Sequence, residues 1–177
     1  MKKELILHSF SASRLIMVNS TPAILEGILK GENLLQDMLD IKVPDQWTEF
    51  GPAPFEYALN KIKDTPADSI WWSWLPILVS ENTLIGNCGY KGPPVDGAVE
   101  IGYEVAVAYR NQGFATEIAK ALVVNAFNQP DVKTIIAHTL PEENESVSVL
   151  QKCGFRFVSP IEDPEDGLIW RWQLDKE

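Results

Sequence analysis

The stretch from Val99 to Phe127 constrains the fold more than any other part of the chain. Apolar residues alternate with polar or small residues from Val99 to Val107, which predicts a long strand whose two faces differ. A turn containing Gly113 follows, and the next residues have apolar side chains at helical spacing: Ala115, Ile118, Ala119, Leu122 and Ala126. A strand, a glycine turn and an amphipathic helix in this order predict an α/β chain whose helix packs on a sheet.

The remaining segments predict further strands and helices around this unit. No segment repeats and no long linker interrupts the chain, so we expect one domain over residues 1–177, a mixed sheet with helices on both faces. The expected strands are 14–18, 70–79, 84–90, 131–139, 155–158 and 168–174, and the expected helices are 22–30, 55–63 and 144–152.

Three tryptophans, Trp71, Trp72 and Trp74, fall within the expected strand 70–79. Core packing is the preferred interpretation of these side chains. The alternative is an aromatic wall for a substrate.

Composition excludes some classes of partner and leaves others open. The formal net charge of -10 argues against nucleic acid, which would recruit a basic stripe. The same acidity could steer a cationic amine inward, or serve solubility alone. Cys88 and Cys153 lie far apart in no metal or redox pattern, so we expect buried thiols in a reducing cytoplasm. Residues 1–7 are too short for a signal-peptide core, and no apolar run is long enough to cross a membrane.

The turn at residues 110–116 has the properties of an anion-binding loop. A glycine turn that opens a helix exposes unpaired backbone N–H groups at the positive end of the helix dipole. Gly113 permits close approach of a pyrophosphate, and Arg110 and Thr116 could add donors. The residues match neither a Walker loop nor a Rossmann fingerprint, and a plain tight turn is the competing interpretation.

Two motifs in this region resemble those of the GNAT superfamily of N-acetyltransferases. The runs 100–103 (EIGY) and 109–116 (YRNQGFAT) resemble its Q/R-x-x-G-x-G/A signature, and the runs 140–146 (LPEENES) and 149–155 (VLQKCGF) resemble its second motif. The resemblance is closest to the branch that acetylates N-terminal amines of ribosomal proteins. It implies a mixed, mostly antiparallel sheet split between two central strands, with acetyl-CoA in the gap between the strand ending near Val107 and the strand ending near Thr139.

The same resemblance implies roles for individual residues. The backbone of the split strand would polarise the thioester carbonyl, and Glu100 or Glu104 would be the general base; we prefer Glu100. These two carboxylates share a strand face roughly 13 Å apart, and each could also be an ordinary solvated residue. Ser146 would donate to the departing thiolate, or merely cap a helix. The predicted contacts to coenzyme A are Val105, Val107, Arg110, Gln112, Gly113, Phe114, Ala115, Thr116 and Asn144.

Two positions depart from the family pattern. Leu150 stands where many members have a catalytic tyrosine, and Glu143 stands where they have an asparagine that contacts coenzyme A. His138 lies beside the expected cleft as a packed or hydrogen-bonded strand residue, and we predict no metal site. The expected function is direct acetyl transfer from acetyl-CoA to a primary amine of a protein N-terminus or a small molecule. A non-catalytic acyl-CoA-binding module is the alternative, and a homodimer is left open.

Overall fold

The computed structural model describes residues 8–177, so the prediction for residues 1–7 falls outside the described part. The strands are β1 (Ser9–Ser11), β2 (Leu15–Asn19), β3 (Ser73–Leu78), β4 (Thr83–Leu84), β5 (Gly86–Tyr90), β6 (Ala98–Val105), β7 (Thr134–Thr139), β8 (Arg156–Asp163) and β9 (Gly167–Asp175). The helices are α1 (Pro22–Lys30), α2 (Glu32–Leu39), α3 (Ala53–Ile62), α4 (Phe114–Phe127) and α5 (Glu145–Lys152). Short 3-10 helices cover Pro66–Trp71 and Val107–Tyr109.

The strands form one sheet in the order β1-β2-β3-β5-β6-β7-β9-β8, with β4 added on β3. Every pairing between these strands is antiparallel except that of β6 with β7, which is parallel. The predicted fold class, a mixed and mostly antiparallel sheet with helices, is confirmed.

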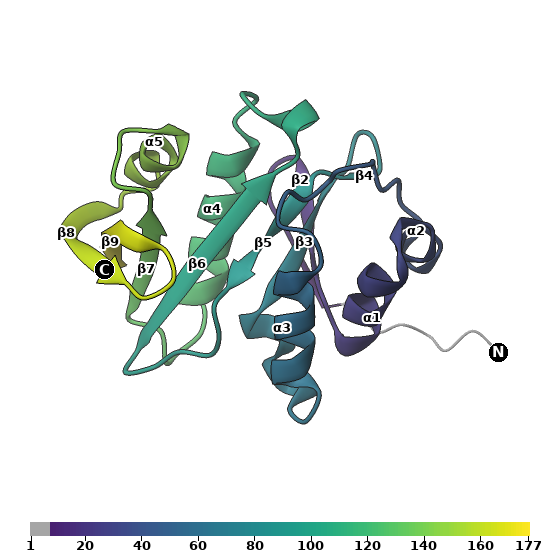
Figure 1. Ribbon diagram of the computed structural model, residues 1–177, viewed down its shortest axis with the longest axis horizontal. Helices are drawn as coiled ribbons and strands as arrows, with labels where there is room; N and C mark the ends of the chain where they lie inside the picture. The colour runs from purple at the N-terminus through teal and green to yellow at the C-terminus, as the bar shows by residue number, and fades with distance from the viewer. Residues whose placement is uncertain (1–7) are drawn as a thin grey trace.

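The sheet is split at its centre, between β6 and β7. These strands pair only at Ala98–Glu100 with Thr134–Ile136, although β6 runs on to Val105 and β7 to Thr139. Figure 1 shows the two strands close together at one end and diverging toward their carboxyl ends. The split was predicted at this pair of strands, and it leaves an open wedge between them.

Two apolar clusters hold helices against opposite faces of the sheet. The first contains Trp74, Ile101 and Ile135 of the sheet with buried residues of α4 and α5. The second contains Leu75, the neighbour of Trp74, with buried residues of α1, α2 and α3. Neighbouring residues of a strand point to opposite faces, so this division follows from the alternation in the sequence.

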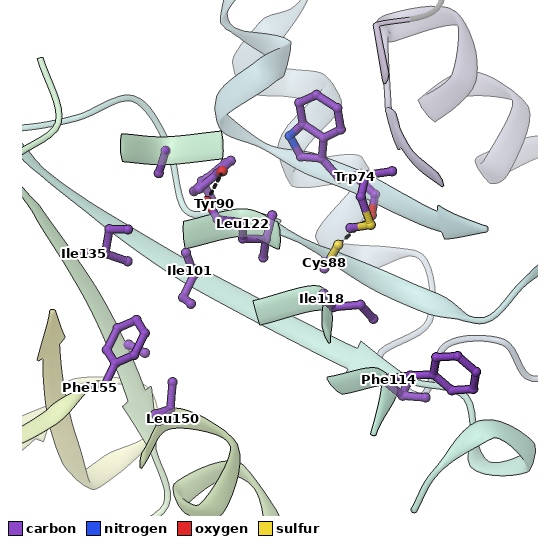
Figure 2. Packing of buried hydrophobic residues seen from close by; sticks show 14 of the residues in the cluster. Trp74, Cys88, Tyr90, Ile101, Phe114, Ile118, Leu122, Ile135, Leu150 and Phe155 are labelled. Carbon is purple, nitrogen blue, oxygen red and sulfur yellow. Dashed lines mark hydrogen bonds between the residues drawn. The ribbon is translucent and has the colours of Figure 1, made fainter. Parts of the chain in front are cut away.

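Helix α4 forms as the glycine turn predicts. Gly113 has a φ of 81°, in the left-handed region that favours glycine, and the helix begins at the next residue. Figure 2 shows Ile118 and Leu122 of α4 beside Ile101 of β6, and the Tyr90 hydroxyl donates to the Leu122 carbonyl at 2.8 Å. The amphipathic stripe therefore anchors the helix, and with it the turn at its start, on the sheet.

The predicted boundaries need several corrections. Strand β7 begins at Thr134 rather than at residue 131, and β8 continues to Asp163, beyond the predicted 155–158. Ile70 and Trp71 belong to a 3-10 helix and not to a strand. Val107 also lies in a 3-10 helix, because β6 ends at Val105.

Helix α2 and strand β1 were not predicted: β1 has only three residues, whereas the apolar residues of α2 (Leu34, Leu35, Met38 and Leu39) do recur at helical spacing. By contrast, helix Pro22–Lys30 is confirmed at both ends, and Thr21 caps it by accepting from the Ile24 N–H.

The three tryptophans do not share one environment. Trp74 is buried in the core, and Trp71 packs against Tyr90 with ring centroids 5.4 Å apart. Trp72 instead lines a cavity on the other face and contacts Tyr57 edge to face. The packing interpretation therefore describes all three, because Trp71 and Trp72 pack against the two apolar clusters, and Trp72 also lines the cavity.

Candidate active site

A cavity of about 430 Å³ opens beside the split, within the usual size range of small-molecule sites. It is lined by residues from α3, β5, β6, β7 and α5. All three predicted catalytic residues line it: Glu100, Glu104 and Ser146. The tertiary structure thus brings together side chains from β6 and α5 that lie more than 40 residues apart in the sequence.

Glu100 lies where β6 and β7 begin to separate, since it is the last residue of β6 that pairs with β7. Its Oε1 is 2.5 Å from Nζ of Lys91 and 2.9 Å from Nδ1 of His138. Both contacts use the same oxygen, which leaves Oε2 to accept a proton from a ligand. Lys91 was not recognised from the sequence, because it comes from the loop after β5 and is brought to Glu100 only by strand pairing.

His138 is a hydrogen-bonded strand residue, as expected. Its Nδ1 meets Glu100, and its Nε2 is buried with no hydrogen-bond partner among residues 8–177. The ring is thereby held in place by Glu100 rather than presented to solvent.

Glu104 has different partners from Glu100. Its Oε1 accepts from the Thr48 hydroxyl at 2.6 Å, and its Oε2 accepts from the Glu49 N–H at 3.0 Å. Both oxygens therefore hold the loop between α2 and α3 against β6. Glu104 therefore fixes this loop through both of its oxygens. Glu100, by contrast, has one oxygen, Oε2, that can bind a ligand.

The backbone of β6 directs N–H groups into the split. The Ala106 N–H donates to the Ile85 carbonyl, and the Lys91 N–H donates to the Glu100 carbonyl, so the even-numbered residues of β6 face β5. Backbone groups alternate along a strand, and those of Val105 therefore point to the opposite side, toward β7. Because β7 no longer pairs there, the Val105 N–H faces the open wedge.

The predicted phosphate loop lies at the start of α4. Gly113 is the N-cap of the helix and supplies no side-chain hydrogen bond, so the first backbone N–H groups of α4 keep their donors for a ligand. Phe114 is buried in the core, and Ala115 and Thr116 follow in the first turn. The loop thus has the backbone geometry of an anion site.

Arg110 is engaged within the protein. Its Nε donates to the Val105 carbonyl at 2.9 Å, and its Nη2 forms an ion pair with Glu49 at 2.5 Å. A contact between this guanidinium and a phosphate would require it to leave Glu49. Gln112 is exposed, and its Nε2 donates to the Ala108 carbonyl at 3.2 Å.

Arg14 lies beside the loop, although no sequence signal assigned it there. Its Nη2 donates to the Gln112 carbonyl at 3.1 Å, its Nε pairs with Glu117 at 2.8 Å, and its guanidinium stacks on the Phe114 ring at 4.0 Å. The residue is 98 positions from Gln112, so only the tertiary structure shows that it braces this turn.

Helix α5 begins at the other side of the wedge. Oδ1 of Asn144 accepts from the Val147 N–H at 3.1 Å, so this side chain caps the helix and only its Nδ2 is left for a ligand. Ser146 is exposed in the first turn and lines the cavity. Glu143 is exposed in the preceding turn, and Leu150, at the family's tyrosine position, is buried.

Tyr103 of β6 places its phenol near the start of α5. Its hydroxyl donates to the Ser146 carbonyl at 3.5 Å, and burial raises its pKa above the ordinary value. The phenol therefore stays protonated at neutral pH and acts as a hydrogen-bond donor. The alternating pattern predicted a strand that contains Tyr103, but not the position of its phenol between β6 and α5.

Comparison with known proteins identifies the family. A model described as an acetyltransferase (GNAT) domain matches residues 35–156, so the chain belongs to the GNAT acetyltransferase family. The chain is 34% identical over 80 residues to the uncharacterised N-acetyltransferase YnaD of Bacillus subtilis, and 30% identical over 91 residues to the uncharacterised N-acetyltransferase p20 of Bacillus licheniformis. These matches cover 45% and 50% of this chain and 47% and 51% of the relatives, so the chain spans about half the length of the curated relatives it matches.

Solved structures share the fold over nearly the whole chain. A GNAT-family acetyltransferase from Bacillus anthracis is 21% identical, with a TM-score of 0.64 over 95% of this chain and 98% of that one. The ribosomal-protein-S5-alanine acetyltransferase of Vibrio fischeri is 14% identical, with a TM-score of 0.67 over 95% and 96%. RimL, a ribosomal L7/L12 α-N-protein acetyltransferase, is 13% identical, with a TM-score of 0.69 over 99% and 98%. At such identities the likeness establishes the fold alone.

Within residues 8–177, none of the helices has the length and apolar character that crossing a membrane requires.

Proposed function

We propose that this chain is an acetyl-CoA-dependent N-acetyltransferase that transfers acetyl directly to a primary amine. The observation that carries the proposal is the split between β6 and β7, which has the free Val105 N–H on its edge and Glu100 at its base. A solved complex of the structural neighbour RimL contains coenzyme A, which supports the same ligand for this fold. Cys88 and Cys153 are free thiols, which is compatible with action in the reducing cytoplasm.

In this proposal coenzyme A lies along the wedge. Its pyrophosphate contacts the backbone of Gln112 to Thr116 at the start of α4, where the helix dipole favours an anion. A Cβ atom added at Gly113 would meet only Nη2 of Arg14, at 3.7 Å, so the loop surface is open to a ligand. The Val105 N–H donates to the thioester carbonyl, where negative charge develops during attack.

The amine must lose a proton before it can attack the thioester. Oε2 of Glu100 accepts that proton, directly or through one water, while Lys91 and His138 hold the other oxygen. The amine nitrogen then bonds to the acetyl carbon and the carbon–sulfur bond breaks. The departing thiolate takes a proton with the help of hydroxyl donors on its side of the wedge, Ser146 and Tyr103.

The proposal is tested by release of the coenzyme A thiol from acetyl-CoA in the presence of a panel of primary amines. N-terminal peptides, polyamines, aminoglycosides and amino acids belong in the panel, since structural neighbours include ribosomal-protein and spermidine N-acetyltransferases. Amine-dependent thiol release with a matching acetylated product would support the enzyme.

The alternative, a non-catalytic acyl-CoA-binding module, is favoured by Leu150 at the family's tyrosine position and by Glu143 at the position where the family has an asparagine that contacts coenzyme A. It predicts calorimetric binding of acetyl-CoA with no thiol release for any amine. Absence of both binding and transfer would contradict both functions.

A further inference from the structure

Gly102 lies inside β6 and lines the active-site cavity. A glycine within a strand lowers stability, because the chain loses more conformational freedom on folding and no side chain packs against its neighbours. A fold requires glycine where φ is positive or where a neighbouring group leaves no room for a Cβ atom. Neither condition holds at Gly102. Its φ lies outside the left-handed region, and an added Cβ atom would meet no heavy atom within 4 Å, its chain neighbours aside.

Gly89 of β5 lies directly opposite Gly102 and shows the contrast. Its φ is 146°, and an added Cβ atom would collide with the Trp72 carbonyl, because β3 pairs with β5 at this residue. The fold therefore requires glycine at position 89. Among the glycines of residues 8–177, Gly102 alone has neither a positive φ nor a neighbour that a Cβ atom would meet. The backbone does not explain its missing side chain, whereas a ligand in the open space above it would.

The two glycines form a bare stretch of the cavity floor between two polar pairs. Lys91 and Glu100 lie on one side of the glycine pair, and Asn87 and Glu104 lie on the other. All four residues line the cavity, as does Phe50 from the loop that Glu104 holds. Glu100 and Glu104 are roughly 13 Å apart at strand rise, so a ligand with its amine at Glu100 must be extended to reach the far pair.

Asn87 presents a hydrogen-bond donor at the far end. Its Oδ1 accepts from the Ser73 hydroxyl at 3.0 Å, and that hydroxyl lies 3.0 Å from the hydroxyl of the fully buried Ser20. These contacts fix the amide and leave its Nδ2 to donate to a ligand. Glu104 accepts from neutral donors only within residues 8–177, and a carboxylate has about four acceptor sites, so Glu104 can accept from a ligand as well. The far end therefore suits a group that both accepts and donates, as a hydroxyl does.

We propose that Gly102 determines acceptor specificity by leaving the floor clear for the body of the substrate. The acceptor is a primary amine on an extended chain, with the reacting amine at Glu100 and a group that both donates and accepts at Asn87 and Glu104. The inference rests on the proposed function.

The first test enlarges the side chain at position 102, with 5-amino-1-pentanol and methylamine as acceptors. Gly102→Val should lower kcat/KM for the amino alcohol at least about tenfold, mainly through KM, and Gly102→Ala should lower it less, because each added methyl group takes space from the ligand. Methylamine has no extended body, so its kcat/KM should change less than about threefold. The KM for acetyl-CoA should stay unchanged. Ala98→Val is the matched control, since Ala98 lies on the same face of β6 and does not line the cavity.

Both variants at position 102 should keep the Tm of the wild-type protein or raise it. Alanine and valine restrict the unfolded chain more than glycine does, and valine also favours strands. Thermal unfolding measures this directly.

The second test uses the wild-type protein with n-hexylamine, which has a methyl group in place of the hydroxyl of 5-amino-1-pentanol. We expect kcat/KM to be at least about fivefold higher for the amino alcohol, because a methyl group gives Nδ2 of Asn87 no acceptor.

A loss in Gly102→Val no greater than in Ala98→Val would refute the role of Gly102. So would an equal loss for methylamine, which would indicate a disturbed Glu100, or a Tm lowered by more than about 4 °C, which would show that the fold itself needs this glycine. Equal use of hexylamine and the amino alcohol would refute the polar far end. If the wild-type protein acetylated no amine of the wider panel, the proposed function would fail and the inference with it.

Discussion

The two ends of β6 carry the same residue type on the same face, in different surroundings. Glu100 lies at the end that still pairs with β7, and its partners are Lys91 and His138. Glu104 lies four residues on, where β7 has separated, and its partners are Thr48 and the Glu49 N–H. The sequence places both glutamates on one strand face, and the chain segments that contact them give them different partners.

The comparison shows how a candidate active site forms where β6 and β7 stop pairing. Where β6 and β7 pair, the backbone is satisfied within the sheet. Where they diverge, the Val105 N–H is left without a strand partner and can donate to a ligand. A carboxylate with a free oxygen beside this opening can take part in chemistry, whereas one bound on both oxygens can hold a loop.

The largest expected effect tests the Glu100 end. Glu100→Gln should lower kcat for acetyl transfer ~10²-fold or more, because the amine loses its proton acceptor. Acetyl-CoA affinity should stay nearly unchanged, as measured by calorimetry. The rate loss should shrink as pH rises, because more of the amine is then already deprotonated. A loss that is equal at every pH would indicate a positioning role instead.

The next effect tests the phosphate loop beyond the Glu104 end. Gly113→Leu should weaken acetyl-CoA binding well over tenfold, because the new side chain would occupy the approach of the pyrophosphate. Gly167→Leu is the matched control: Gly167 has a similar positive φ of 72° and open space around it, but lies in the β8–β9 turn. Equal affinities of the two folded variants would contradict the assignment of the loop.

A smaller effect is expected from Glu104. Glu104→Gln should raise the KM for the amine a few-fold and change kcat by less than about threefold, because the loop that bears Phe50 loosens while Glu100 is intact. Thr48→Val should reproduce the same change in steady-state kinetics, since it removes a donor to the same carboxylate. A kcat loss comparable to that of Glu100→Gln would identify Glu104 as the base.

The smallest expected effect concerns the ion pair between Glu49 and Arg110. Glu49→Gln should release the guanidinium and tighten acetyl-CoA binding about two- to threefold at low salt, because an unpaired arginine can turn to a phosphate. The gain should disappear in the double variant Glu49→Gln with Arg110→Gln. Unchanged affinity in the single variant would show that Arg110 serves only the Val105 carbonyl and the loop.

Much of the fold could be predicted because its signals are local. The start of helix Pro22–Lys30 follows from the Thr21 cap and the proline after it, and α4 follows from Gly113 and a continuous apolar stripe. Ile70 and Trp71 were assigned to a strand because aromatic and β-branched residues favour both strands and buried turns. Helix α2 was missed although its sequence carries a helical signal, since Leu34, Leu35, Met38 and Leu39 recur at helical spacing.

The sequence by itself determined the family, the order of the main elements, the glycine turn of α4 and three of the residues that line the cavity, Glu100, Glu104 and Ser146. These properties depend on the spacing of residues within short segments, and that spacing can be read from the sequence alone. Only the tertiary structure decided that Lys91 and His138 meet Glu100, that Thr48 binds Glu104, and that Arg14 braces the Gly113 turn. Such contacts join side chains from separate strands and loops, so they depend on strand register and on the point where β6 and β7 part, which no local pattern encodes.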